Sequence, residues 1–242
     1  MLQPAMAIIK TSLNYNLCKK MQKYYPIFIS LKDKKVLVVG GGRVSERKIQ
    51  GLLNKEAVIY VVSPELTQGL KKLAAAGLIT WHNRFFQPQD LQDAWLVIAA
   101  TNDPATQRLI SELAAANHIF CNVVNAPEQG SFINPTIIEN GPIQVAVSTS
   151  GSSPVLAKRL KQELTPVVTR HSTGYIAFLE EMRTWIIATE DNAQKRKELL
   201  LSLDNTRIEE SFTKGQWHYI EDWVKKNYGY DALYIVKKHT KS

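Results

Sequence analysis

The chain has 242 residues, 45% of them hydrophobic, which is enough to bury a large core in one large domain or two smaller ones. No stretch approaches the ~18 apolar residues of a membrane-spanning helix, so we expect no membrane partner. The only two cysteines, Cys18 and Cys121, are far apart in the sequence. A disulfide framework is therefore not expected, and a cytoplasmic location is favoured.

The net charge of +8 favours an anionic partner. The chain has no block of five or more like charges, and its aromatic residues do not alternate with basic ones as in a groove for single-stranded nucleic acid. We therefore expect a small molecule with several carboxylates or phosphates, and no nucleic acid. A diffuse basic surface that serves only solubility is the alternative.

Residues 1–23 form an N-terminal extension in which we expect little folded structure. Its apolar patch, residues 5–9, has no charged region before it, which makes a poor secretory signal. The pattern typical of folded structure begins at about Tyr24, and Met21 offers a second plausible start.

The strongest local signal is a strand, a tight turn and a helix start. The apolar run 36–39 leads into three consecutive glycines, Gly40 to Gly42, and then into the polar, helix-forming run 45–50. Glycine lets the backbone approach a phosphate closely, and a helix N-terminus offers unpaired N–H groups at the positive end of its dipole. The pattern favours a dinucleotide pyrophosphate. Because Ser45 replaces the third glycine of the GxGxxG fingerprint, an ordinary strand-to-helix turn stays the alternative.

Short apolar runs then alternate with amphipathic segments, which is typical of βαβ units and a parallel sheet. Strands are expected at residues 35–39, 57–62, 78–81, 95–100 and 119–122, and helices at residues 44–54, 66–76 and 104–117. Asp103 is placed to cap the last helix, with Pro104 in its first position. Right-handed crossovers predict a Rossmann-type, doubly wound α/β sheet with its ligand site at the carboxyl ends of the strands.

Three loops should meet at that edge of the sheet. They follow the first, second and fourth strands and hold the candidate cofactor-binding residues: Gly40, Gly41, Gly42, Arg43, Val44, Ser63, Pro64, Glu65, Thr101, Asn102 and Asp103. Ser63 stands where an acid usually binds the ribose, so Glu65 could bind it instead, or act as a first-turn helix acid. Arg43 could contact a 2′-phosphate or cover the pyrophosphate. We prefer NAD to NADP as the cofactor.

A small antiparallel segment is expected after the sheet. Two strand-like stretches, residues 131–139 and 143–148, flank the dipeptide Asn140-Gly141, which favours a two-residue hairpin turn. Pro142 argues for an edge position or a looser turn. We expect this segment to contribute to a dimer, although the chain's own helices could cover it instead.

A serine-rich run leads from the hairpin into a helix over residues 155–163. Ser153 is placed as the N-cap of this helix and Pro154 as its first residue. Hydroxyl and N–H groups make this a second helix start that could bind an anion, with the candidate residues Ser148, Thr149, Ser150 and Ser153.

The C-terminal part is expected to be a helical subdomain, with helices at residues 167–189, 193–203, 207–212 and 216–226. Apolar residues recur there at helical spacing and predict a core stripe rather than a cofactor site: Tyr175, Phe178, Leu179, Met182 and Trp185. The expected domain organisation is an extension (1–23), a dinucleotide-binding domain (24–125), a central dimerisation segment (126–165) and a helical subdomain (166–242).

Other candidate chemistry is sparse. No metal motif is present, because neither cysteine has a partner at ligand spacing and the five histidines are scattered. His118 and Asn125 flank the last strand of the predicted sheet. His118 could act as an acid or base, or simply interact with a helix C-terminus. Asn125 cannot exchange a proton at neutral pH, but it can orient a substrate through hydrogen bonds.

Several linked motifs resemble those of the precorrin-2 dehydrogenases of sirohaem biosynthesis. They cover roughly residues 24–168 in the same order and spacing: YPIF at 25–28, VVGGGRVSERK at 38–48, AATND at 99–103, FCNVVNAP at 120–127, SFINP at 131–135 and VAVSTSGSSPVLAKRL at 145–160. The C-terminal third resembles the family only in being helical.

The resemblance implies NAD-dependent oxidation of precorrin-2 to sirohydrochlorin in a homodimer. The carboxylates of this tetrapyrrole would suit the basic balance of the chain and its two helix starts that could hold anions. Relatives that also insert iron carry an aspartate, proposed as their acid–base residue, where this chain has Asn125. This departure favours a dehydrogenase alone, in which the proton leaves to water or to His118. A bifunctional dehydrogenase and chelatase, or a non-catalytic dinucleotide sensor of redox state, are the alternatives.

Overall fold

The computed structural model describes residues 24–240. The N-terminal extension and Cys18 therefore lie outside the described residues. The chain divides into two compact units. Of the described residues, the first unit holds those up to Asn134 together with Ser150–Ser152, and the second holds Pro135–Thr149 and those from Ser153 onward.

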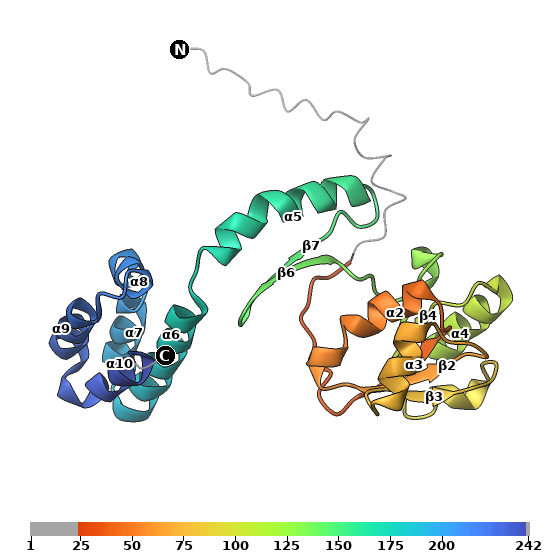
Figure 1. The fold of residues 1–242 in the computed structure, drawn as a ribbon, viewed down its shortest axis with the longest axis horizontal. Coiled ribbons are helices and arrows are strands. Elements are labelled where there is room, and N and C mark those ends of the chain that lie inside the picture. Colours follow the sequence, from red (N-terminus) through yellow and green to blue (C-terminus); the bar gives the residue numbers. More distant parts are fainter. Residues whose placement is uncertain (1–23, 241–242) are drawn as a thin grey trace, which may run out of the picture. The chain divides into compact units, whose positions relative to one another are not determined.

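The first unit contains a five-stranded parallel sheet (Figure 1). Its strands are β1 (Lys35–Val39), β2 (Val58–Val62), β3 (Thr80–His82), β4 (Leu96–Ala99) and β5 (Phe120–Val123). The order β3-β2-β1-β4-β5 runs outward from β1 in both directions, so the sheet reverses its winding between β1 and β4. This order confirms the predicted Rossmann-type sheet.

Helices cover both faces of this sheet, which explains why the central strands are continuous apolar runs. The helices are α2 (Arg43–Gln50), α3 (Gln68–Ala75) and α4 (Pro104–Ala116), with short 3₁₀ turns η2 (Leu53–Lys55), η3 (Pro88–Leu91) and η4 (Pro127–Gln129). Ile49 of α2 and Leu70 of α3 pack in the core of one face. Ile110 and Ala114 of α4 pack in the core of the other.

The third strand begins later than predicted. Gly77 has a φ of +72° and ends α3, and the N–H of Leu78 donates to the carbonyl of Leu73 at 3.0 Å. This bond is typical of a Schellman helix end. Leu78 therefore belongs to the end of the helix, and β3 starts only at Thr80.

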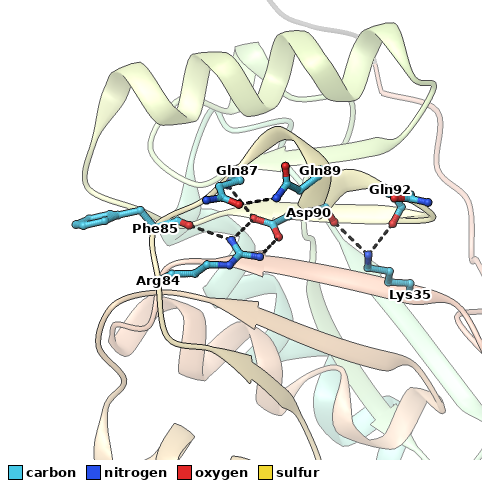
Figure 2. A network of polar contacts seen from close by, with 7 residues as sticks. All are labelled: Lys35, Arg84, Phe85, Gln87, Gln89, Asp90 and Gln92. Atoms are coloured by element: carbon cyan, nitrogen blue, oxygen red, sulfur yellow. Dashed lines mark hydrogen bonds and ion pairs between the residues drawn. The ribbon is translucent and has the colours of Figure 1, made fainter.

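A polar network fixes η3 against the start of β1 (Figure 2). The Lys35 ammonium donates to the carbonyls of Asp90 and Gln92 at 3.1 and 2.6 Å. The Arg84 guanidinium donates to both carboxylate oxygens of Asp90 at 2.8 and 2.5 Å, and the Gln87 N–H donates to the same carboxylate at 2.8 Å. This network ties the connection between β3 and β4 to the sheet.

The second unit starts with an antiparallel hairpin of β6 (Thr136–Asn140) and β7 (Ile143–Val147). Asn140 pairs with Ile143, so the two turn residues are Gly141 and Pro142. The turn therefore lies one residue later than the predicted Asn140-Gly141. Gly141 accommodates a φ of +57°, and proline suits the second position, where φ is negative in a type II′ turn.

Helices complete the second unit: α5 (Pro154–Thr169), α6 (Thr173–Thr189), α7 (Ala193–Ser202), α8 (Thr206–Thr213), α9 (Trp217–Tyr228), η5 (Tyr230–Ala232) and α10 (Leu233–His239). The predicted stripe on α6 lies in the core, where Tyr175, Phe178 and Met182 are buried. Leu179 and Trp185 are partly buried against this core. The last helix, α10, was not predicted.

The prediction of a helix start at residue 167 was wrong, because α5 runs through Pro166 to Thr169. Proline removes one N–H donor from the helix. The chain instead breaks between Thr169 and Thr173, where the Asn140 side chain donates to the carbonyls of Val168 and His171 at 3.0 and 2.7 Å. A contact from the hairpin thus stabilises the end of α5, and local sequence carries no signal for it.

Candidate dinucleotide site

The glycine turn brings the three predicted loops together. Gly40 has a φ of +115°, and a Cβ added to it would lie 2.4 Å from the carbonyl oxygen of Ala100 in the loop after β4. A Cβ on Gly41 would lie 1.9 Å from the carbonyl oxygen of Glu65 and 2.9 Å from the hydroxyl of Ser63, both after β2. These two positions require glycine because the neighbouring loops fill the space of a side chain.

Gly42 differs from the other two glycines. It is the N-cap of α2, and no atom of residues 24–240 lies within 4 Å of an added Cβ. Among the described residues no side chain caps α2, whereas Thr67 caps α3 and Asp103 caps α4. The N-terminus of α2 therefore offers its N–H groups to open space beside a backbone without a side chain. A pyrophosphate fits this arrangement, because it accepts hydrogen bonds and complements the helix dipole.

The loop after β2 is fixed by its main chain. The Ser63 N–H donates to the His82 carbonyl at 3.2 Å, and the Ser63 carbonyl accepts from the Trp81 indole at 2.9 Å. Ser63 is buried, while Pro64 and Glu65 are exposed. The loop thus holds a buried hydroxyl next to the glycine turn and an exposed carboxylate two residues further on.

The loop after β4 is fixed by side chains. Asp103 caps α4 as predicted, accepting from the N–H groups of Ala105 and Thr106 at 3.2 and 3.0 Å. The Thr106 hydroxyl and N–H hold the pKa of Asp103 below its usual range. The Gln107 amide donates to the carbonyl of Thr101 at 2.5 Å. Sequence reasoning missed this role of Gln107. The sequence feature that could have indicated this role is a polar residue three positions before the buried Ile110, on the same face of α4.

Asn125 and His118 lie at opposite edges of the sheet. Asn125 is exposed and follows the carboxyl end of β5, at the edge that holds the glycine turn. His118 precedes β5, with a φ of +55°, and is exposed just after the end of α4. The structure therefore brings Asn125, but not His118, to the edge of the candidate dinucleotide site.

The serine-rich segment starts α5 as predicted. The Ser153 hydroxyl accepts from the Leu156 N–H at 3.2 Å. The Thr149 hydroxyl donates to the Ser153 carbonyl and accepts from its N–H, both at 3.1 Å. Ser150 adopts a φ of +51°. Ser148, Thr149 and Ser153 belong to the second unit and Ser150 to the first, and their role in substrate binding stays a prediction.

Two absences hold for residues 24–240. No helix in this range is both long and apolar enough to cross a membrane. In the same range, no group of three or more histidine, cysteine, aspartate or glutamate side chains is arranged to hold a metal ion.

The fold and the glycine turn define a dinucleotide-binding protein of the Rossmann type. Residues 27–136 match a family described as putative NAD(P)-binding, and residues 140–165 match the central segment of sirohaem biosynthesis proteins. The chain belongs to the precorrin-2 dehydrogenase family of sirohaem biosynthesis.

Individual relatives agree with this assignment. Siroheme synthase 3 of Aeromonas hydrophila is 40% identical over 195 residues, which cover 79% of this chain and 41% of the relative. The siroheme synthase of Escherichia coli O157:H7 is 44% identical over 160 residues, covering 66% of this chain and 35% of the relative. The chain thus spans about two fifths of the siroheme synthases that it matches. The solved structure of SirC, a precorrin-2 dehydrogenase, superposes with a TM-score of 0.68 at 26% identity, covering 89% of this chain and all of SirC.

Proposed function

We propose that the protein oxidises precorrin-2 to sirohydrochlorin, with NAD as the oxidant. The observation that carries the proposal is the N-terminus of α2, which has no side-chain cap from the part of the chain that the structure describes and no atom of that part within 4 Å of an added Cβ on Gly42. A helix N-terminus with accessible N–H groups is a site where a pyrophosphate can bind. The family assignment supplies the substrate class, and the match to SirC supports the same reaction for a chain of this extent.

The reaction removes one hydride and one proton from the tetrapyrrole. Bound NAD would accept the hydride, which is the difficult part of the chemistry. Residues of the three loops would hold the dinucleotide, with Gly40–Gly42 at the pyrophosphate and Ser63, Glu65 and Thr101 around it. The protein itself would then contribute mainly by orienting the substrate and the dinucleotide toward each other and by excluding other arrangements of the two.

Asn125 would orient the substrate rather than take its proton, because an amide does not titrate at neutral pH. Its exposure at the carboxyl edge of the sheet suits contact with a large ligand. The released proton would pass to water. The substrate carboxylates would be held by Ser148, Thr149, Ser150 and Ser153, and the net charge of +8 favours their approach.

Purified protein tests the proposal directly when it is mixed with precorrin-2 and either NAD or NADP. We expect sirohydrochlorin and NADH to form together, in equal amounts and faster than without protein. Dinucleotide binding without any turnover of precorrin-2 would contradict the oxidation and favour a non-catalytic sensor. Absence of both binding and turnover would contradict the dinucleotide site as well.

The proposal includes a homodimer built on the hairpin and α5. Both elements expose apolar side chains: Ile137 is 42% exposed, Val155 80%, Leu164 37% and Val167 47%. Exposed apolar side chains gathered on adjoining elements often mark a protein interface. We expect light scattering to give a mass twice the 27.3 kDa of one chain, and a monomer mass at micromolar concentration would contradict the dimer.

A cytoplasmic location is also part of the proposal. Cys121 is a free, buried thiol and is the one cysteine among residues 24–240, so these residues hold no disulfide framework of the kind that oxidising compartments favour. Recovery of the chain in the membrane or secreted fraction of cells would contradict this location.

A further inference from the structure

The second unit holds a cavity of its own, formed by α8, the start of α9 and the turn between them. The two helices pack against each other (Figure 1). The cavity has a volume of about 650 Å³ and is open to solvent. Sites for small molecules have volumes in this range. No residue of the proposed dinucleotide or substrate site lines it, so the proposed oxidation leaves this cavity without a role.

The Ser211 hydroxyl is a buried polar group at this cavity. Ser211 is only 3% exposed and lines the cavity, and within residues 24–240 its hydroxyl makes no hydrogen bond. The nearby Thr213 hydroxyl, in contrast, donates to the carbonyl of Glu209 four residues earlier on the same helix. Buried polar groups without a partner cost free energy, and each one calls for an explanation. A bound ligand that accepts a hydrogen bond would explain Ser211.

Two further side-chain donors border the same cavity. The Arg207 guanidinium carbon lies 5.0 Å from the centre of the Tyr219 ring, and the guanidinium makes no ion pair with the described residues. The Trp217 indole nitrogen lies 3.8 Å from an added Cβ on Gly215, a lining residue, and makes no hydrogen bond within the same range. No acid among residues 24–240 lines the cavity. The donors therefore converge without an acceptor from these residues.

The aromatic walls of the cavity are fixed by packing. The Trp217 ring packs edge-on against the buried Phe212, with ring centroids 4.8 Å apart. The contact between Arg207 and Tyr219 holds the guanidinium and the second ring together. A ligand would therefore meet flat apolar surfaces and donors that need little reordering, which lowers the entropic cost of binding.

We propose that this cavity binds an aromatic carboxylate. A guanidinium is planar and donates two parallel hydrogen bonds to a carboxylate, and the Ser211 hydroxyl and the Trp217 N–H add further donors. The rings of Trp217 and Tyr219 offer flat surfaces on which an aromatic ring packs well. A single arginine balances the single charge of a carboxylate. The proposal does not rest on the proposed oxidation, because it uses none of the residues of the dinucleotide site.

Titration of the isotope-labelled full chain with benzoate tests the proposal by NMR, without dinucleotide or turnover. We expect benzoate to shift the indole N–H signal of Trp217. The chain has five tryptophans, and this signal is identified by its absence in Trp217→Phe. Arg207→Gln should weaken benzoate binding about tenfold, because it removes the charge and the paired donors. Arg183→Gln, an exposed arginine of α6 that does not line the cavity, is the matched control and should keep the affinity.

Ser211→Ala separates a role in ligand binding from a role in folding. It should also weaken benzoate binding about tenfold, because a hydrogen bond to a charged group is lost. The midpoint of chemical unfolding should stay the same or rise slightly, since the hydroxyl has no partner among the described residues. A variant that unfolds more easily and binds benzoate normally would overturn the assignment of Ser211 to the site.

Benzamide, inorganic phosphate and sirohydrochlorin are the comparison ligands. An equal response to the neutral benzamide overturns recognition of a carboxylate, and tighter binding of phosphate overturns the ligand class. A Trp217 signal that benzoate does not shift overturns the site. Displacement of benzoate by sirohydrochlorin supports the site and assigns it to a carboxylate arm of the tetrapyrrole. Benzoate binding that sirohydrochlorin does not displace supports a site for a separate small molecule.

Discussion

Replacing Gly42 with aspartate is expected to weaken dinucleotide binding strongly while the first unit stays folded. The side chain has room, because no atom of the described range 24–240 lies within 4 Å of an added Cβ. The backbone at this position is extended, with φ −84° and ψ −175°, and aspartate is a favoured N-cap residue. Its carboxylate would therefore accept hydrogen bonds from the first turn of α2, and this is the place of the expected pyrophosphate.

The loss of affinity has two physical sources in this variant. The carboxylate competes with the pyrophosphate for the same N–H groups, and its charge repels the phosphates. Like charges at about 4 Å near a protein surface cost up to roughly 4 kcal/mol, so a loss of about a hundredfold or more in NAD affinity is expected. Precorrin-2 oxidation should fall with it, while the midpoint of chemical unfolding stays the same or rises slightly.

Gly42→Ala is the matched control for this experiment. Alanine adds a Cβ in the same open space without a charge or a capping oxygen, so most of the NAD affinity should remain. Gly41→Ala cannot serve as the control, because its Cβ would collide with the Glu65 carbonyl and displace the loop after β2. Equal NAD affinity in Gly42→Asp and the unmodified protein would show that the pyrophosphate does not bind at α2.

The sheet could be predicted from sequence because each central strand is a short apolar run buried on both faces. Val36, Val38 and Val61 are fully buried, and the predicted boundaries of β1 and β2 agree with the structure to within one residue. The end of α3 is less predictable, since its Schellman turn includes Leu78, a residue that looks like part of the next strand. The end of α5 at Thr169, beyond Pro166, is stabilised by the hairpin residue Asn140, which is remote in sequence.

The candidate site, like the fold, could be predicted from the sequence only in part. The sequence indicates which loops meet, because topology brings the carboxyl ends of β1, β2 and β4 to one edge. It presents three equivalent glycines, whereas the structure gives Gly40 and Gly41 a packing role and leaves only Gly42 facing open space. The hydrogen bond that Glu46 accepts from the Thr67 hydroxyl also joins α2 to the start of α3, and local sequence does not predict it.

Breaking the ion pair between Arg84 and Asp90 is expected to cause a large loss of stability (Figure 2). The Asp90 side chain is only 6% exposed, and the Arg84 side chain is 35% exposed. Burial raises the pKa of Asp90, but the Arg84 hydrogen bonds, the Gln87 N–H and the Arg84 charge together outweigh burial and hold this pKa below its usual range. The pair therefore contributes stability above the unfolded-state pKa of the carboxyl, and this stability is lost as the pH falls through the folded-state pKa.

Arg84→Met is expected to lower the free energy of unfolding at neutral pH by about 2–3 kcal/mol, somewhat less than for a fully buried pair because Arg84 is partly exposed. The variant leaves the Asp90 carboxylate buried and without the Arg84 hydrogen bonds and charge, while the Gln87 N–H and the nearby His82 remain, so the folded-state pKa of Asp90 should rise. Acidification then protonates Asp90 in the folded variant before it does so in the unmodified protein. The stability difference between the two proteins should therefore narrow as the pH falls.

Chemical unfolding should be followed from neutral pH down to the pH at which Asp90 is protonated. Hydrogen exchange of the amides in β4 would show that the loss of stability lies within the first unit. Lys32→Met is the matched control, because Lys32 pairs with Glu56 at 3.4 Å while both side chains are about two thirds exposed. Such surface pairs contribute at most ~1 kcal/mol, so this control should change stability little at any pH. A stability difference in Arg84→Met that stays constant as Asp90 is protonated would show that the arginine acts through packing of its side chain rather than through its charge.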